Sequence, residues 1–89
     1  MEDRDHIRTT VDEDRAQESA VLQQVLALHP TAVTIEELVR ELDPGRDSFG
    51  RRDAVERAVR DLAGSGLLHR GESLVRPTRA ALRFDELLG

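Results

Sequence analysis

The sequence predicts an α+β fold with about four helices and a small three-stranded antiparallel sheet. Three observations predict it: apolar residues recur at helical spacing in four segments, glycine or proline stands near the ends of three of these segments, and two short apolar segments follow Gly66 in close succession. A chain of 89 residues forms one small domain. Phe49 and Phe84 are the only aromatic residues, so the core must be aliphatic.

The N-terminal part of the chain predicts a tail and a first helix. Residues 1–12 are highly charged and nearly free of apolar side chains, so we expect a disordered tail followed by one folded domain over residues 13–89. The helix is predicted over Glu13–His29, where apolar residues follow a period of about 3.6. Pro30 disfavours helical backbone at the residue before it and therefore ends this helix.

A short strand and a second helix are predicted next. Thr31–Val33 contains two β-branched residues and fits a single short strand. Thr34 and Glu37 have the spacing of a capping box, in which the hydroxyl and the carboxylate each accept a hydrogen bond from a free backbone amide. The helix that begins here ends at Leu42, before the turn-forming Asp43-Pro44-Gly45.

A third helix, a hairpin and a last helix complete the prediction. The third helix covers Arg51–Ala63, and Gly64 is expected to be its left-handed stop. The strands Leu67–Arg70 and Ser73–Arg76 are expected to pair across Gly71-Glu72, because glycine permits the positive φ of a two-residue hairpin loop.

Thr78 is expected to cap the last helix, Arg79–Leu88. The predicted core combines the aliphatic residues that share one periodicity with a single aromatic residue. Its members are Val21, Leu22, Val25, Leu28, Leu38, Leu42, Val55, Val59, Leu62, Leu67, Val75 and Phe84. Leu82 falls on the side of the last helix opposite Phe84 and is expected to be exposed, where it offers a seam for a homodimer with the first helix.

Composition excludes several classes of function. The chain has no cysteine, which excludes disulfides, thiolate metal sites and cysteine nucleophiles. The three histidines lack the spacing of a metal site, and no serine, histidine and aspartate pattern suggests a nucleophile. We therefore predict no enzyme activity, no catalytic, cofactor-binding or metal-binding residue and no cofactor. Without a membrane-spanning run or a secretory signal, a cytoplasmic location is expected.

The net charge of −5 is unevenly distributed. Residues 1–50 contain 5 arginines and 12 acidic residues, whereas residues 51–89 contain 8 arginines and 6 acidic residues. The two halves thus carry −7 and +2. The C-terminal half is therefore the part of the chain that favours an anionic partner.

Several features of the chain occur together in one known family. They are the capped helix from Thr34, the helix Arg51–Ala63, Gly66-Leu67-Leu68 at the opening of the hairpin, and Val75-Arg76-Pro77-Thr78 leading into the last helix. With these features, residues 16–88 resemble the winged helix-turn-helix domains of bacterial regulators. The resemblance implies a small transcriptional regulator whose third helix enters the major groove of double-stranded DNA, while the hairpin, or wing, contacts the DNA backbone.

Five arginines are the candidate DNA-binding residues under this resemblance. Arg51 and Arg52, at the start of the third helix, would hold phosphates. Arg57 and Arg60 lie on the helix side opposite the apolar residues and would reach base edges. Arg70 would contact the backbone from the wing.

A second interpretation stays open. Asp53 precedes Arg57 by four residues and Glu56 precedes Arg60 by four, the spacing and order of stabilising helical ion pairs. Paired in this way, the arginines would form a solvated surface, and the chain would be a protein–protein interaction module without DNA binding. The two interpretations differ in whether the arginines form one positive surface or are neutralised by Asp53, Glu56 and Asp61.

Overall fold

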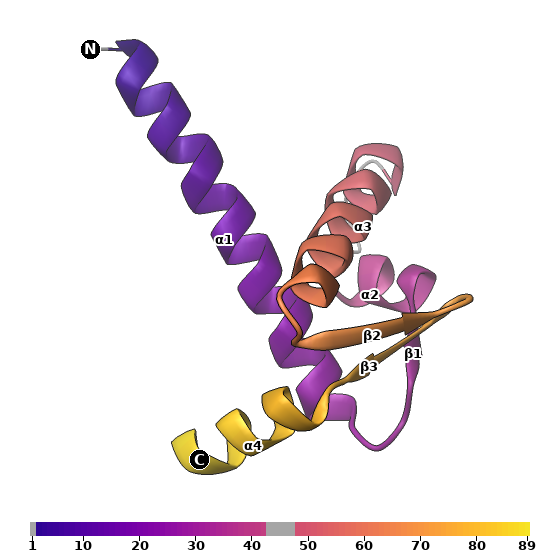
Figure 1. Cartoon of the computed structure of the whole chain (residues 1–89). Coiled ribbons are helices and arrows are strands. Elements are labelled where there is room, and N and C mark those ends of the chain that lie inside the picture. Colours follow the sequence, from indigo (N-terminus) through magenta and orange to yellow (C-terminus); the bar gives the residue numbers. More distant parts are fainter. Residues whose placement is uncertain (1, 43–47) are drawn as a thin grey trace.

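The computed structural model describes residues 2–42 and 48–89, with side chains for 11–42 and 50–89. Its elements are, in order, α1 (Glu2–Leu28), β1 (Val33–Thr34), α2 (Ile35–Leu42), α3 (Ser48–Gly64), β2 (Leu68–Gly71), β3 (Leu74–Pro77) and α4 (Arg79–Leu88) (Figure 1). The strands form one antiparallel sheet with β3 in the centre, between β1 and β2. The predicted four helices and three-stranded antiparallel sheet are confirmed.

Helices α1, α2 and α3 and the sheet enclose one aliphatic core. Its buried members are Val21, Val25, Val33, Ile35, Leu38, Val55, Ala58, Val59, Leu62, Leu68 and Val75. Leu22, Leu42 and Leu67 are only partly buried against it. The prediction was wrong for Leu28 and Phe84, whose side chains are 37% and 59% exposed.

Helix α4 explains the error at Phe84. Its first turn packs on the body through Ala81, which is buried, and through Leu82, which is half-buried. The rest of the helix runs outward from the end of α1 (Figure 1). The side that carries Phe84 therefore faces solvent, and Leu82, expected to be exposed, belongs to the inner side. Leu82 is therefore not the exposed residue on which the predicted dimer seam depends.

Helix α1 begins at Glu2, well before the predicted start at Glu13. Residues 2–12 are thus helical where the sequence predicts a disordered tail. The N-terminal half of the helix projects away from the other elements (Figure 1), and residues 11–16 are exposed. The division into a tail of residues 1–12 and a domain of residues 13–89 stays a prediction. None of the described helices combines the length and the apolar composition that crossing a membrane requires.

The capping box at the start of α2 is confirmed. The backbone amide of Glu37 donates to Thr34 Oγ1 (3.1 Å), and the amide of Thr34 donates to Glu37 Oε1 (3.3 Å). Helix α2 ends at Leu42 as predicted. The expected turn Asp43-Pro44-Gly45 lies outside the described residues. Strand β1 begins at Val33, two residues later than expected, because Val33 pairs with the buried Val75.

Helix α3 ends in a Schellman motif. The amide of Gly66 donates to the carbonyl of Ala63 (3.1 Å), and the amide of Leu67 donates to that of Leu62 (2.9 Å). Gly66 has a φ of +83°, so it, rather than Gly64, is the left-handed residue of this helix end. The expected stop at Gly64 was wrong by two residues, and the helix itself extends through Gly64.

The hairpin turn lies one residue later than predicted. Gly71 pairs with Leu74 inside the ladder, and Glu72 supplies the positive φ, at 54°. Leu68 consequently pairs with Pro77 rather than with Val75. A change of partner by two positions leaves the same residues on the buried face, so the hydrophobic pattern alone does not distinguish the two registers.

Thr78 connects the start of α4 to the end of α3. Its hydroxyl accepts a hydrogen bond from the amide of Ala81 (3.1 Å), which makes it the N-cap that the sequence predicts. The same hydroxyl donates to the carbonyl of Gly66 (2.7 Å), and the Thr78 amide donates to the carbonyl of Leu67 (3.0 Å). These three bonds fix the direction in which α4 leaves the domain.

Candidate functional site

The outer side of α3 and the inner face of the hairpin enclose a shallow hollow of about 300 Å³. Its lining residues are Asp53, Glu56, Arg57, Arg60 and Arg70. We call it the arginine hollow. It contains three of the five arginines that the sequence marks as candidates.

The period of the helix brings the α3 residues into the hollow. Val55, Val59 and Leu62 are buried against the core, so residues half a turn away point outward. Arg57 and Arg60 are exposed on this outer side. Burial of one stripe of α3 therefore fixes where its arginines lie.

Alternation along the hairpin brings Arg70 to the same place. Successive side chains of a strand point to opposite faces, and directly paired residues share a face. Arg70 pairs with the buried Val75 and follows the buried Leu68 by two residues, so it lies on the face that packs on α3. His69 and Arg76 pair on the opposite face and are exposed there.

The helical ion pairs expected within α3 are not formed. Arg52 instead binds Glu56 (Nε to Oε1, 3.0 Å) and also Glu36 of α2 (Nη1 to Oε2, 3.1 Å). Among the described residues, no ion pair within 4.0 Å involves Arg57, Arg60 or Arg70. Arg52 thus binds the carboxylate that sequence spacing assigns to Arg60.

The bridge between Arg52 and Glu36 also shifts the pKa of both groups. A hydrogen bond from the backbone amide at Glu36, followed by the bond from Arg52, lowers the pKa of the Glu36 carboxyl. The bond to Glu36 raises the pKa of Arg52. Both side chains are well exposed, so the bridge holds α2 against the start of α3 without a buried charge.

Arg51 and Arg52 lie outside the arginine hollow. Arg51 is half-buried and reaches toward α1, where its Nη1 lies 3.4 Å from Gln17 Oε1. Arg52 is engaged by the two carboxylates of its bridge. The structure therefore brings together Arg57, Arg60 and Arg70 and separates them from the other two candidates. Whether any of the five binds DNA stays a prediction.

Carboxylates border the hollow on its α1 side. Arg57 also lines a small groove between α1 and α3, together with Asp14, Glu18 and Asp61. Asp53 lies in the hollow itself. The arginines thus gather on one surface, but acidic groups at its edge weaken the positive potential there.

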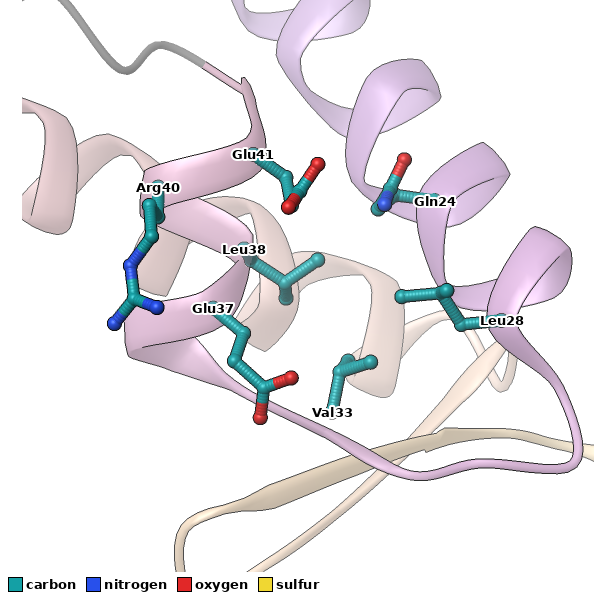
Figure 2. A pocket seen from close by; sticks show the side chains of 7 residues that line it. All are labelled: Gln24, Leu28, Val33, Glu37, Leu38, Arg40 and Glu41. Atoms are coloured by element: carbon teal, nitrogen blue, oxygen red, sulfur yellow. The ribbon is translucent and has the colours of Figure 1, made fainter.

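A second cavity, which the sequence did not suggest, lies between α1 and α2 (Figure 2). We call it the α1–α2 pocket. It has a volume of about 230 Å³ and is lined by Gln24, Leu28, Val33, Glu37, Leu38, Arg40 and Glu41. Leu28, Val33 and Leu38 form an apolar floor, while Figure 2 shows Glu41 and Gln24 facing each other above it.

Glu37 and Glu41, two acidic residues one turn apart on a short helix, are the sequence feature from which its rim could have been inferred. Metal ligation has no comparable signal. In the part of the chain that the structure describes, no group of three or more histidine, aspartate and glutamate side chains is placed to hold a metal ion.

Comparison of the chain with models of protein families, with curated proteins and with solved structures gives no significant match. The features of this chain that bear on function are therefore the arginine hollow and the chemistry of its residues.

Proposed function

We propose that this chain binds double-stranded DNA as a small transcriptional regulator of the winged-helix type. The observation that supports this most directly is the convergence of Arg57, Arg60 and Arg70 on one hollow. Arginine is suited to both parts of such a site, since its guanidinium binds phosphates and pairs with guanine through two hydrogen bonds.

In this proposal, α3 enters the major groove, which is wide enough to admit a helix. Arg57 and Arg60 then face base edges, and Arg70 contacts a phosphate from the hairpin. Glu56 opposes them less than a free carboxylate would, because Arg52 binds it, but Arg52 is shared with Glu36 and the three groups together keep one negative charge. In this proposal, Arg51 and Arg52, which lie outside the hollow and contact α1 and α2, have a structural part in the domain instead of the phosphate contacts that the resemblance implies.

The decisive experiment is titration of a random-sequence duplex, followed by fluorescence anisotropy, at several salt concentrations between about 50 and 200 mM, a range over which phosphate contacts weaken strongly. A random-sequence duplex offers Arg57 and Arg60 no selected bases, so there they contact phosphates as Arg70 does. The three contacts correspond to a log–log slope of about −2.7, at ~0.9 per contact. The absence of binding at the lowest salt concentration would disprove the proposal. The hollow would then be assigned to a protein partner.

Single substitutions distinguish the roles of the three arginines in the hollow. Arg57→Ala and Arg60→Ala should each weaken binding to a selected sequence by about 1–3 kcal/mol if they contact bases. Arg70→Ala should weaken binding to all sequences alike and reduce the salt slope by about one. Arg15→Ala is the matched control, because it removes an exposed arginine from α1, outside the hollow. It should change affinity far less than any of the three.

A further inference from the structure

Helix α4 carries an apolar surface that has no partner within the described chain. Phe84, Leu87 and Leu88 are 59%, 68% and 73% exposed. Their i, i+3 and i+4 spacing puts them on one face of the helix. We call this face the α4 stripe. Clustered large apolar side chains of this kind mark interaction surfaces, whereas isolated ones are ordinary on protein surfaces.

The α1–α2 pocket offers a matching surface. Its volume of about 230 Å³ lies below the ~300–1,000 Å³ of typical small-molecule sites, so it suits one large side chain better than a whole ligand. Its floor is apolar, and its lining also includes the carboxylates of Glu37 and Glu41 and the guanidinium of Arg40 (Figure 2). Glu37 already accepts hydrogen bonds from Thr34, so Glu41 is the carboxylate left for a partner. Neither carboxylate pairs with a cation among the described residues. An apolar side chain with an adjacent cation would satisfy both parts.

We propose that the α4 stripe of a second copy of this chain docks in the α1–α2 pocket. Phe84 enters over Leu28 and Leu38, and the preceding Arg83 lies along the rim beside Glu41. The sign of the charges supports this occupant, because the arginine of α4 meets the Glu41 carboxylate, while Figure 2 shows Arg40 directed away from Glu41. Within its own helix, Arg83 has only a long, exposed contact with Glu86, at 3.8 Å.

The position of the two surfaces allows the contact to be reciprocal. The pocket includes Leu28, the last residue of α1, and α4 packs against α1 and leaves the domain at that end (Figure 1). Both surfaces thus flank the C-terminal end of α1. A two-fold axis near this end lets each copy give its α4 to the other, which closes a dimer instead of extending a fibre.

The test is the association of the 89-residue chain, measured by sedimentation equilibrium over a wide concentration range. We expect a monomer–dimer equilibrium. Phe84→Ser and Glu41→Arg should each weaken the dimer by about tenfold or more. Glu72→Arg, the same charge reversal at the hairpin turn, is the matched control and should leave association unchanged. Thermal melts establish that each variant is folded.

A charge exchange makes the test specific for the proposed contact. Arg83→Glu alone should weaken the dimer as Glu41→Arg does, because each places like charges together. The double variant with Glu41→Arg and Arg83→Glu should restore association to within about threefold of the original chain. A chain that stays monomeric throughout, a dimer insensitive to Phe84→Ser, or a double variant without rescue would each overturn the proposal.

Discussion

Helices α3 and α4 are held to the domain in different ways. Helix α3 is anchored over two turns of its C-terminal half by Val55, Ala58, Val59 and Leu62, all buried. Helix α4 is anchored by its first turn, through Ala81 and the cap at Thr78. After that turn no side of α4 packs on the domain, so its large apolar side chains stay exposed.

The difference shows what each helix can offer a partner. A helix packed along one whole side has only its other side available, and on α3 that side is charged. A helix anchored at one end exposes its apolar residues together with its charges. This difference underlies both proposals, an anionic partner for α3 and an apolar partner for α4. Four predictions test the anchoring of the two helices.

The largest effect is expected from a charge on the inner side of α3. Val59 is fully buried, so Val59→Asp places an unpaired carboxylate in the core. The cost should be roughly 3 kcal/mol or more, against a total stability of roughly 4–13 kcal/mol for a domain of this size. A thermal melt followed by circular dichroism should show loss or a strong downward shift of the transition. Val11→Asp, at a side chain 42% exposed on α1, is the control and should barely move it.

The anchor of α4 should be the next most sensitive point. Thr78→Ala removes the N-cap bond to the Ala81 amide and the bond to the Gly66 carbonyl. We expect a loss of about 1–2 kcal/mol, at the upper end of cap substitutions because two bonds are lost. Thr78→Ser keeps the hydroxyl and should recover most of the stability. Chemical denaturation of both variants measures the difference, and equal losses would show that the hydroxyl bonds do not hold α4.

The end of α3 offers a matched pair of glycines. Gly66→Ala forces a side chain onto a φ of +83° and should cost about 1 kcal/mol. Gly64 is the last helical residue, and a Cβ there meets no atom within 4 Å, so Gly64→Ala should be neutral or stabilising by up to ~1 kcal/mol. Denaturant unfolding of the two variants decides between them. The reverse order would place the left-handed residue at Gly64.

The smallest effect concerns the bridge from α2 to α3. The folded chain lowers the pKa of Glu36, so this group contributes stability above its unfolded pKa of about 4.3, and the contribution is lost as pH falls through the lower folded value. Glu36→Gln should therefore destabilise the chain slightly at pH 7 and reduce the loss of stability between pH 5 and pH 3. The raised pKa of Arg52 acts only in strongly alkaline solution. Thermal melts of both chains at pH 7, pH 5 and pH 3 measure the change.

Local signals predicted much of this fold from the sequence. The capping box at Thr34, the cap at Thr78 and the bounds of α4 depend on neighbouring residues, and the structure confirms them. The position of the hairpin turn and the side of α4 that faces inward depend on long-range packing. Because α4 is amphipathic but packs only through its first turn, its hydrophobic period predicted the wrong side of the helix to be buried.

The candidate site was predictable in part for the same reason. The helical period identified Arg57 and Arg60 as outward-facing, and alternation in the hairpin explains Arg70. Sequence spacing offers Glu56 two partners, Arg52 four residues before it and Arg60 four residues after it, and does not decide between them. The contact of Arg52 with Glu36 joins two helices and has no signal in local spacing. The α1–α2 pocket likewise depends on how two helices diverge.

The hairpin register has a consequence for how the hollow tolerates changes in chain length. Arg70 reaches the hollow because it stands an even number of residues after the buried Leu68. Lengthening both strands by two residues beyond Arg70 would preserve this parity and extend the hairpin without disturbing either the core or the arginine. Inserting one residue between Leu68 and Arg70 would break the parity and send the guanidinium to the face of His69. In this domain, an arginine on the hairpin faces α3 only at every second position.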